Sequence, residues 1–258
     1  VDRDYAYAVG RIRILETKLL PTAFFERLLK AASVSEALRL LAETTYAVDG
    51  QAAEYEEVFE EELFRVYQLL RDLMGDPPEL LVFLHRWDLQ NLKLLLVAGA
   101  KIQPSRLGRI PFPELERMVA AGDYTALPSE IQAALASLPE AGPDRAAVLD
   151  QAYYRYGWRI LGKHAGLLRD YWRARMDLLN LLIFLRLRKR DASLEELTRF
   201  MVEPGFISRN DWLSKFAEPQ PELGILLEYT PYRDLLRDGD RILYELSSLE
   251  RAIDDYLL

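Results

Sequence analysis

Two acid–amide pairs are the residues of this chain whose types and spacing could support chemistry. Asp88 and Asn91 lie three positions apart among leucines, and Asp177 and Asn180 repeat the arrangement 89 positions later. In a helix this spacing places the two polar side chains of a pair on one face. Either aspartate could serve as a general acid or base. Because no reactive partner accompanies them, we interpret both pairs as structural.

The structural interpretation gives each aspartate a specific requirement. A buried carboxylate is costly unless it is hydrogen-bonded, so we expect each one to accept bonds from an arginine or from backbone amides at a neighbouring helix N-terminus. Replacing Asp177 by alanine should then lower the free energy of unfolding by on the order of 3 kcal/mol. Repetition over such a distance also predicts a fold built by duplication.

A second segment resembles a nucleotide-binding motif. Residues Gly157 to Lys163 contain two glycines and a lysine at the spacing of a phosphate-binding loop. However, His164 stands where that loop needs Ser or Thr to hold magnesium, and the preceding residues have a helical rather than a strand pattern. We favour a close-packed helix break, and a nucleotide-binding enzyme is the alternative.

The remaining candidate sites are weaker. His85 and Asp88 could share a helix face, but two ligands do not make a metal site, and we expect no metal or other cofactor. The basic run Leu185 to Arg190 could contact lipid headgroups or an acidic partner. Cations at a helix C-terminus also complement the helix dipole, and we favour this local role.

Composition narrows the class of protein further. The chain has 258 residues, a hydrophobic content of 50%, a net charge of -8 and no cysteine. It can therefore build a sizeable core, but it lacks a broad positive surface for nucleic acid and has no thiolate or disulfide chemistry. Its apolar runs are shorter than the roughly 18 residues that cross a bilayer, so we expect any membrane contact to be peripheral.

Helical periodicity runs through nearly the whole chain and predicts an all-α fold. Two pairs of long helices are expected at 54–73 with 79–100 and at 147–161 with 167–189. Shorter helices are expected at 5–20, 24–32, 34–44, 113–121, 129–138, 194–201, 211–216 and 223–227, with a last one from 240. The two pairs align when Asp150 is placed over Glu60. We accordingly expect three helical repeat domains, at 1–104, 105–190 and 191–258.

The N-terminal segment Tyr5 to Arg13, the segment Glu43 to Tyr46 and the repeated Asp-x-x-Asn-Leu motif together resemble the C subunit of V/A-type ATPases, the counterpart of the eukaryotic d subunit. The resemblance covers the whole chain. It implies a pseudo-threefold funnel of three similar all-α domains with no catalytic site of its own.

The same resemblance implies a mechanical role in a rotary ATPase. The protein would couple the central shaft, formed by the D and F subunits, to the proteolipid ring during proton or sodium transport linked to ATP synthesis or hydrolysis. It would lie peripherally, through the ring, at the cytoplasmic face of the cell membrane. An unrelated helical-repeat interaction module is a further alternative.

The third repeat departs from the family pattern. A third acid–amide pair, at the spacing of the first two repeats, would fall beyond Leu258. We therefore expect the third domain to be incomplete and an apolar face of the final helix, from Asp240 to Leu258, to be uncovered.

Overall fold

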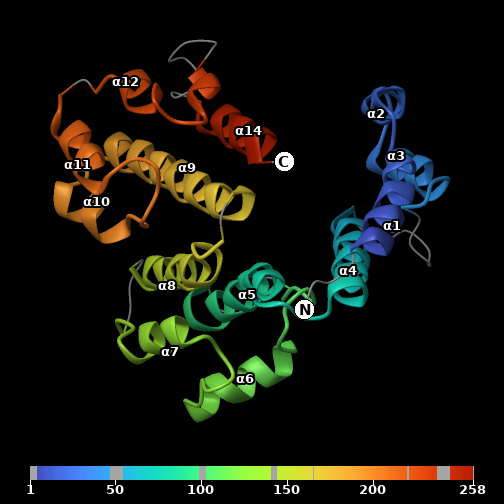
Figure 1. Ribbon diagram of the computed structural model, residues 1–258, viewed down its shortest axis with the longest axis horizontal. Coiled ribbons are helices and arrows are strands. Elements are labelled where there is room, and N and C mark those ends of the chain that lie inside the picture. Colours follow the sequence, from blue (N-terminus) through green and yellow to red (C-terminus); the bar gives the residue numbers. More distant parts are fainter. Residues whose placement is uncertain are drawn as a thin grey trace. The chain divides into compact units, whose positions relative to one another are not determined.

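The computed structural model describes residues 5–46, 55–98, 103–140, 144–164, 166–219, 221–236 and 245–257. Within these ranges the regular elements are helices and no strand occurs, which confirms the predicted all-α class (Figure 1). None of the helices described combines the length and the apolar character that crossing a bilayer demands.

The chain divides into two compact units. Unit 1 comprises Val1–Asp88 and Gln103–Phe112, and unit 2 comprises Leu89–Ile102 and Pro113–Leu258. The division into three repeat domains stays a prediction.

In its described part, unit 1 contains four helices and most of a fifth. They are α1 (Ala6–Glu16), α2 (Thr22–Leu29), α3 (Val34–Ala42), α4 (Tyr55–Met74) and α5 (Pro78–Lys93), whose last residues belong to unit 2. The helix predicted to reach residue 100 keeps regular α geometry only to Lys93, and a π-helical turn, Leu94–Ala98, follows.

Helices α1 to α4 bury few large apolar side chains. Ala8, Phe24 and Val58 are their buried apolar residues, whereas Val9, Ile14 and Phe59 are each more than half exposed. An open groove of about 550 Å³ lies between α1 and α4 and has Ile12, Leu15, Leu19, Val66 and Leu69 in its lining. Unit 1 therefore presents apolar surface that its own described helices do not cover.

Unit 2 contains nearly all of α6 and every later helix that the structure describes. These are α6 (Phe112–Ala121), α7 (Ser129–Ala136), α8 (Asp144–Leu161), α9 (Leu167–Lys189), α10 (Leu194–Phe200), α11 (Arg209–Ala217), α12 (Leu223–Leu227), the short 3₁₀ turn η2 (Arg233–Leu236) and α14 (Leu246–Leu257). Helix α9 contacts α8, α10 and α14, and α8 also packs on α7. The longest of the described helices is thus the centre of this unit.

Aromatic side chains fill the core around α9. Phe184 lies with its ring centre 6.0 Å from that of Trp212 and 5.1 Å from that of Phe216. At the other end of α9, Trp172 contacts the rings of Tyr153 and Tyr154. All three residues of this second group are buried, as expected for core anchors.

The last described helix corrects one expectation. Leu249 and Ile253 of α14 are buried in the same apolar cluster as Leu181 and Phe184 of α9. The prediction of an uncovered apolar face is therefore wrong for Leu246–Leu257, because α9 supplies the covering surface. The predicted start of this helix, near Asp240, lies outside the described residues.

Candidate functional site

The first acid–amide pair is completely buried on α5, with 0% exposure at both Asp88 and Asn91. Asp88 Oδ1 accepts the backbone N–H of Ile110 at 2.9 Å, and its Oδ2 lies 2.8 Å from Nδ1 of His85. Ile110 lies two positions before the first residue of α6. Asp88 therefore fixes the chain entering that helix.

The second pair is buried in the same way on α9. Asp177 Oδ2 accepts the backbone N–H groups of Phe206 at 2.5 Å and Ile207 at 3.1 Å, and the hydroxyl of Tyr232 donates to it at 2.5 Å. Ile207 lies two positions before the first residue of α11. Of the two alternatives expected for these carboxylates, amides near a helix N-terminus are thus the partners, and no arginine pairs with either aspartate in the described residues.

Asn180 extends the second contact along the same loop. Its Nδ2 donates to the carbonyl of Val202 at 2.8 Å, and its Oδ1 accepts the N–H of the same residue at 2.9 Å. An amide side chain that pairs with both backbone groups of one residue fixes that residue in position and orientation. Asp177 and Asn180 together hold residues 202–207 against α9.

A glycine beside each aspartate is required for the contact. A Cβ atom built on Gly108 would overlap Oδ1 of Asp88, and one built on Gly205 would overlap the carboxylate of Asp177. Each glycine lies two positions before the isoleucine whose amide the aspartate accepts. We call these contacts the first clasp (Asp88 with Gly108–Ile110) and the second clasp (Asp177 with Gly205–Ile207).

Sequence reasoning identified the aspartates but missed the other half of each clasp. The signal was present as Gly-x-Ile, followed after a short interval by Phe112 in one copy and Arg209 in the other, where the next helix begins. Alone, a Gly-x-Ile tripeptide is too common to be noticed. Its significance appears only when the tertiary structure places it against the repeated aspartate.

The other long helix of each predicted pair, α4 for the first clasp and α8 for the second, bonds to residues shortly before the clasp glycine. Glu60 of α4 accepts from the hydroxyl of Ser105 at 2.7 Å and from the N–H of Arg106 at 3.0 Å. Gln151 of α8 donates to the carbonyls of Arg199 and Met201, at 2.5 and 2.8 Å. Gln151 directly follows Asp150, the residue that the sequence aligned with Glu60, so the two contacts come from neighbouring but not identical positions of the aligned helices.

Burial dominates the electrostatics of the second clasp. It raises the pKa of Asp177, an effect that the hydrogen bonds from Tyr232 and from the two amides oppose. Burial, followed by the negative charge of Asp177, also raises the pKa of Tyr232. Oδ1 of Asp177 and Nε1 of Trp212 are both buried and form no hydrogen bond of regular geometry in the described residues, but the Trp212 side chain also lowers the pKa of Asp177, as a weak donor to the carboxylate would. A carboxylate in such surroundings suits a structural contact better than proton exchange with a substrate.

The segment that resembles a phosphate-binding loop is helical where that loop would be irregular. Residues 157–161 belong to α8. A Cβ on Gly157 would overlap the ring of Trp172, and one on Gly162 would overlap Trp158. Both glycines are therefore explained by close packing, and they form no phosphate cradle.

The remaining residues that the sequence suggested as binding groups, His85 and the basic run Leu185 to Arg190, have partners within the chain. His85 contacts Asp88, and no group of three potential metal ligands occurs among the described residues. In the basic run, Arg186 donates to Glu250, Arg188 to the carbonyl of Pro219 and Arg190 to Glu196. These arginines hold the C-terminal end of α9 to its surroundings in unit 2.

Comparison with known proteins gives a consistent result. The ATP synthase (C/AC39) subunit family matches residues 8–258. The C subunit of the A-type ATP synthase of Methanosarcina mazei is 28% identical over 292 aligned positions, which cover 99% of this chain and 78% of that protein. The C subunit of the V-type ATP synthase of Deinococcus radiodurans is 30% identical over 211 positions, which cover 70% of this chain and 59% of that protein.

Proposed function

The chain belongs to the ATP synthase (C/AC39) subunit family, and from this membership we propose that it is the rotor component that couples the central shaft to the membrane proteolipid ring. It is a subunit of a rotary ATPase and is not itself an enzyme, since the family is a non-catalytic one. Its partners are other subunits of the complex. Under the proposal these are the D and F subunits of the shaft on one side and the ring on the other.

The observation that carries the proposal is the family match over residues 8–258. The uncovered apolar groove between α1 and α4 supports a role within an assembly, because exposed apolar surface of this extent marks interaction sites. The proposal places the protein peripherally on the cytoplasmic face, where torque passes between ring and shaft during proton or sodium transport.

We assign the repeated acid–amide pairs Asp88 with Asn91 and Asp177 with Asn180 a structural role in this function. A torque-transmitting protein must resist deformation, and each clasp ties the loop that enters a helix to a long neighbouring helix. Under the proposal three such domains, 1–104, 105–190 and 191–258, form a funnel around the end of the shaft.

Association with the shaft tests the proposal. The chain is mixed with the purified shaft pair of the same complex and separated by size-exclusion chromatography, with the corresponding full-length family member as the positive control. Co-elution is expected, and it should weaken as salt rises, because an exchangeable polar contact is screened. A shaft pair that binds the positive control and leaves this chain unbound at low salt would refute the proposal.

A further inference from the structure

The apolar groove of unit 1, with a volume of about 550 Å³, lies between α1 and α4. Its apolar lining consists of Ile12, Leu15 and Leu19 on one side and Val66 and Leu69 on the other. We call it the α1–α4 groove. Ile12, Leu15, Leu19 and Val66 are each exposed, so the described helices leave this apolar surface open to solvent.

The spacing of these side chains suits contact with a helix. Ile12, Leu15 and Leu19 follow one another at intervals of three and four positions, and Val66 and Leu69 are three positions apart. Side chains at these intervals form the ridges and grooves on which a further helix packs. A bound amphipathic helix presents its own anchors at the same intervals. The shape of the α1–α4 groove therefore matches one helix.

Helix α4 buries little for its length. It spans 20 residues and buries only Val58, whereas the 18-residue α8 buries seven residues. Helices in proteins gain most of their stability by packing an apolar face against another element. Within the described residues α4 lacks this packing, which favours an occupant of the groove that completes it.

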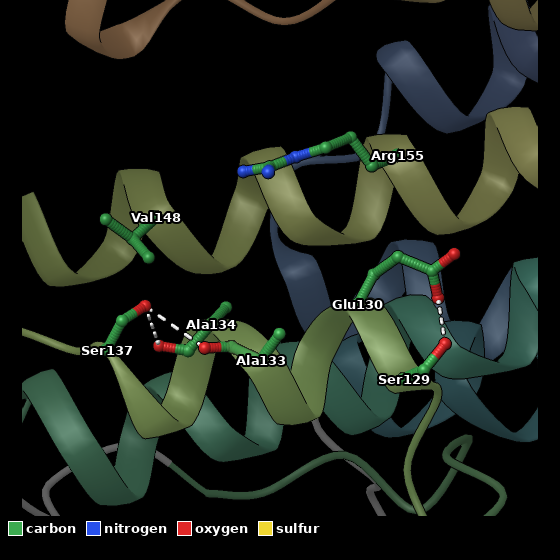
Figure 2. A pocket seen from close by; sticks show the side chains of 7 residues that line it. All are labelled: Ser129, Glu130, Ala133, Ala134, Ser137, Val148 and Arg155. Carbon is green, nitrogen blue, oxygen red and sulfur yellow. Dashed lines mark hydrogen bonds between the residues drawn. The ribbon is translucent and has the colours of Figure 1, made fainter.

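The cavity of about 350 Å³ between α7 and α8 has a different character (Figure 2). The hydroxyl of Ser129 donates to Glu130 at 3.1 Å, and that of Ser137 donates to the carbonyl of Ala133 at 3.0 Å. These polar groups of the wall bond to one another, and α7 packs directly on α8. That cavity lies between helices that are already joined, whereas the α1–α4 groove presents unfilled apolar surface.

The acids that line the α1–α4 groove are paired within the chain. Glu62 lies 3.6 Å from Arg65, one turn later on α4, and Glu16 lies 2.7 Å from Arg13. Charges of both signs therefore surround the apolar surface. Such a rim suits a protein partner better than an anionic membrane, which attracts clusters of basic residues.

Two cations of the lining specify the charge of the matching surface. Arg11 donates to the hydroxyl of Tyr7 at 3.2 Å, and neither Arg11 nor Lys18 has an acid partner in the described part of the chain. The two residues are seven positions apart. Residues seven apart on a bound helix lie two turns apart on one side, so acids at this interval would face both cations.

We propose that the α1–α4 groove binds one amphipathic helix of another subunit of the ATPase complex. The helix packs apolar residues against Leu15 and Val66 and places acids one heptad apart beside Arg11 and Lys18. Membership of the family makes other subunits the available partners. The proposal rests on the subunit role in the proposed function, but it does not depend on whether the chain joins shaft to ring.

Site-directed photo-cross-linking tests the contact directly. Because the chain has no cysteine, Leu15→Cys and Val66→Cys each provide one site for a benzophenone maleimide, attached before the complex is reconstituted. Leu29→Cys, at the exposed end of α2, is the control. We expect the products of the first two variants to map to one helix of another subunit, at positions that differ by three, four or seven residues. No product on that helix is expected from position 29.

Charge reversal tests the acids of the bound helix. Lys18→Glu should weaken binding of the chain to the cross-linked subunit about tenfold, and changing the facing acid to lysine should restore it. Lys30→Glu, which makes the same change at the exposed C-cap of α2, should leave binding unchanged. Thermal unfolding is expected to be the same in both variants, which separates a loss of binding from a loss of folding.

Four outcomes would overturn the proposal. Products on a second copy of this chain would make the groove a dimer interface, and products on lipid alone would make it a membrane contact. Products at alternate positions of the partner would indicate a strand. The fourth outcome is no product from Leu15→Cys or Val66→Cys in an intact complex, together with equal binding of the two lysine variants.

Failure of the groove assignment is distinguishable from failure of the proposed function. If the shaft pair co-elutes with the chain and any of these four outcomes occurs, only the groove assignment fails. If the groove cross-links to a helix of another subunit and the shaft pair does not bind the chain, the groove assignment is supported and shaft coupling is rejected.

Discussion

At the scale of single residues, the clasps show why a buried carboxylate need not be catalytic. Asp177 is 1% exposed, and its Oδ2 accepts two amides and a hydroxyl. Those donors would otherwise be buried without partners, so the carboxylate completes the hydrogen bonding of a loop. The same reasoning applies to Asp88 and the amide of Ile110.

Truncating the buried acid should be strongly destabilising. Asp177→Ala leaves the amides of Phe206 and Ile207 and the hydroxyl of Tyr232 unpaired, and we expect the free energy of unfolding to fall by on the order of 3 kcal/mol. Asp170→Ala, at a half-exposed position in the first turn of the same helix, is the control and should cost at most about 1 kcal/mol. Chemical unfolding monitored by circular dichroism measures both values, and equal losses would contradict the burial argument.

The glycines of the clasps provide an independent test. Gly205→Ala forces a methyl group into the carboxylate of Asp177, so we expect a loss of about 1–3 kcal/mol, as for other overpacked sites. Gly10→Ala in α1 has open space around its Cβ and should be neutral or stabilising by up to about 1 kcal/mol. Thermal unfolding compares the two variants, and a neutral Gly205→Ala would show that the contact is looser than described.

The raised pKa of Asp177 predicts a specific dependence on pH. Burial favours the protonated carboxyl in the native state, so the stability that this group contributes is fully present below the ordinary aspartate pKa of about 3.9 and is lost as pH rises through the higher native pKa. The pKa of Tyr232, which donates its hydroxyl to Asp177, is raised above its usual value and therefore lies outside this window.

Asp177→Asn removes this titration while keeping an oxygen that can accept from the amides. Its unfolding free energy relative to the unmodified chain should therefore rise from pH 4 to neutral pH, as measured by urea unfolding at each pH. A constant difference across that range would mean that the pKa of Asp177 is not raised.

At the scale of elements, α9 is the central helix of unit 2, because it contacts α8, α10 and α14. One part of the helix packs on α8 through Trp172, another holds the loop before α11, and its C-terminal half packs on α14. This explains why its hydrophobic residues do not form a single stripe.

The contact between α9 and α14 makes a prediction about packing. Leu249 is 0% exposed within the apolar cluster that contains Phe184 and Leu181, so Leu249→Ala should cost about 2–5 kcal/mol. Ser247→Ala, two residues earlier and exposed, should change stability by less than about 0.5 kcal/mol. Limited proteolysis should cleave α14 faster in the first variant only, and equal cleavage rates would show that α14 is not anchored by this residue.

At the scale of the whole molecule, the two units differ in how completely they bury apolar surface. Helices α1 to α4 of unit 1 expose residues such as Ile14 and Phe59, whereas α9 alone buries seven apolar residues. Backbone amides of α1 to α4 should therefore exchange with solvent faster than those of α9 in the isolated chain.

Assembly should change this pattern if the apolar groove is an interaction surface. Hydrogen exchange measured by mass spectrometry on the free chain and on the reconstituted complex is expected to show new protection in α1 and α4. Unaltered exchange there in an intact complex would mean that other surfaces carry the contacts.

The sequence by itself determined the all-α class, most helix positions and the repeated acid–amide pairs, because helical periodicity and short-range spacing are local properties. The bounds Leu167–Lys189 of α9 and Leu223–Leu227 of α12 agree with the sequence-based ranges. The motifs were also specific enough to indicate the family, which the match over residues 8–258 establishes.

Only the tertiary structure decided what those residues contact. The partners of Asp177 lie 29, 30 and 55 positions away along the chain, and no local pattern specifies pairing across such separations. The same holds for the packing of Gly157 on Trp172, which explains a motif that resembled a phosphate-binding loop. It also holds for α14, whose apolar face is covered because α9 lies against it. Burial and pairing depend on which distant segments meet, and that is a property of the folded chain alone.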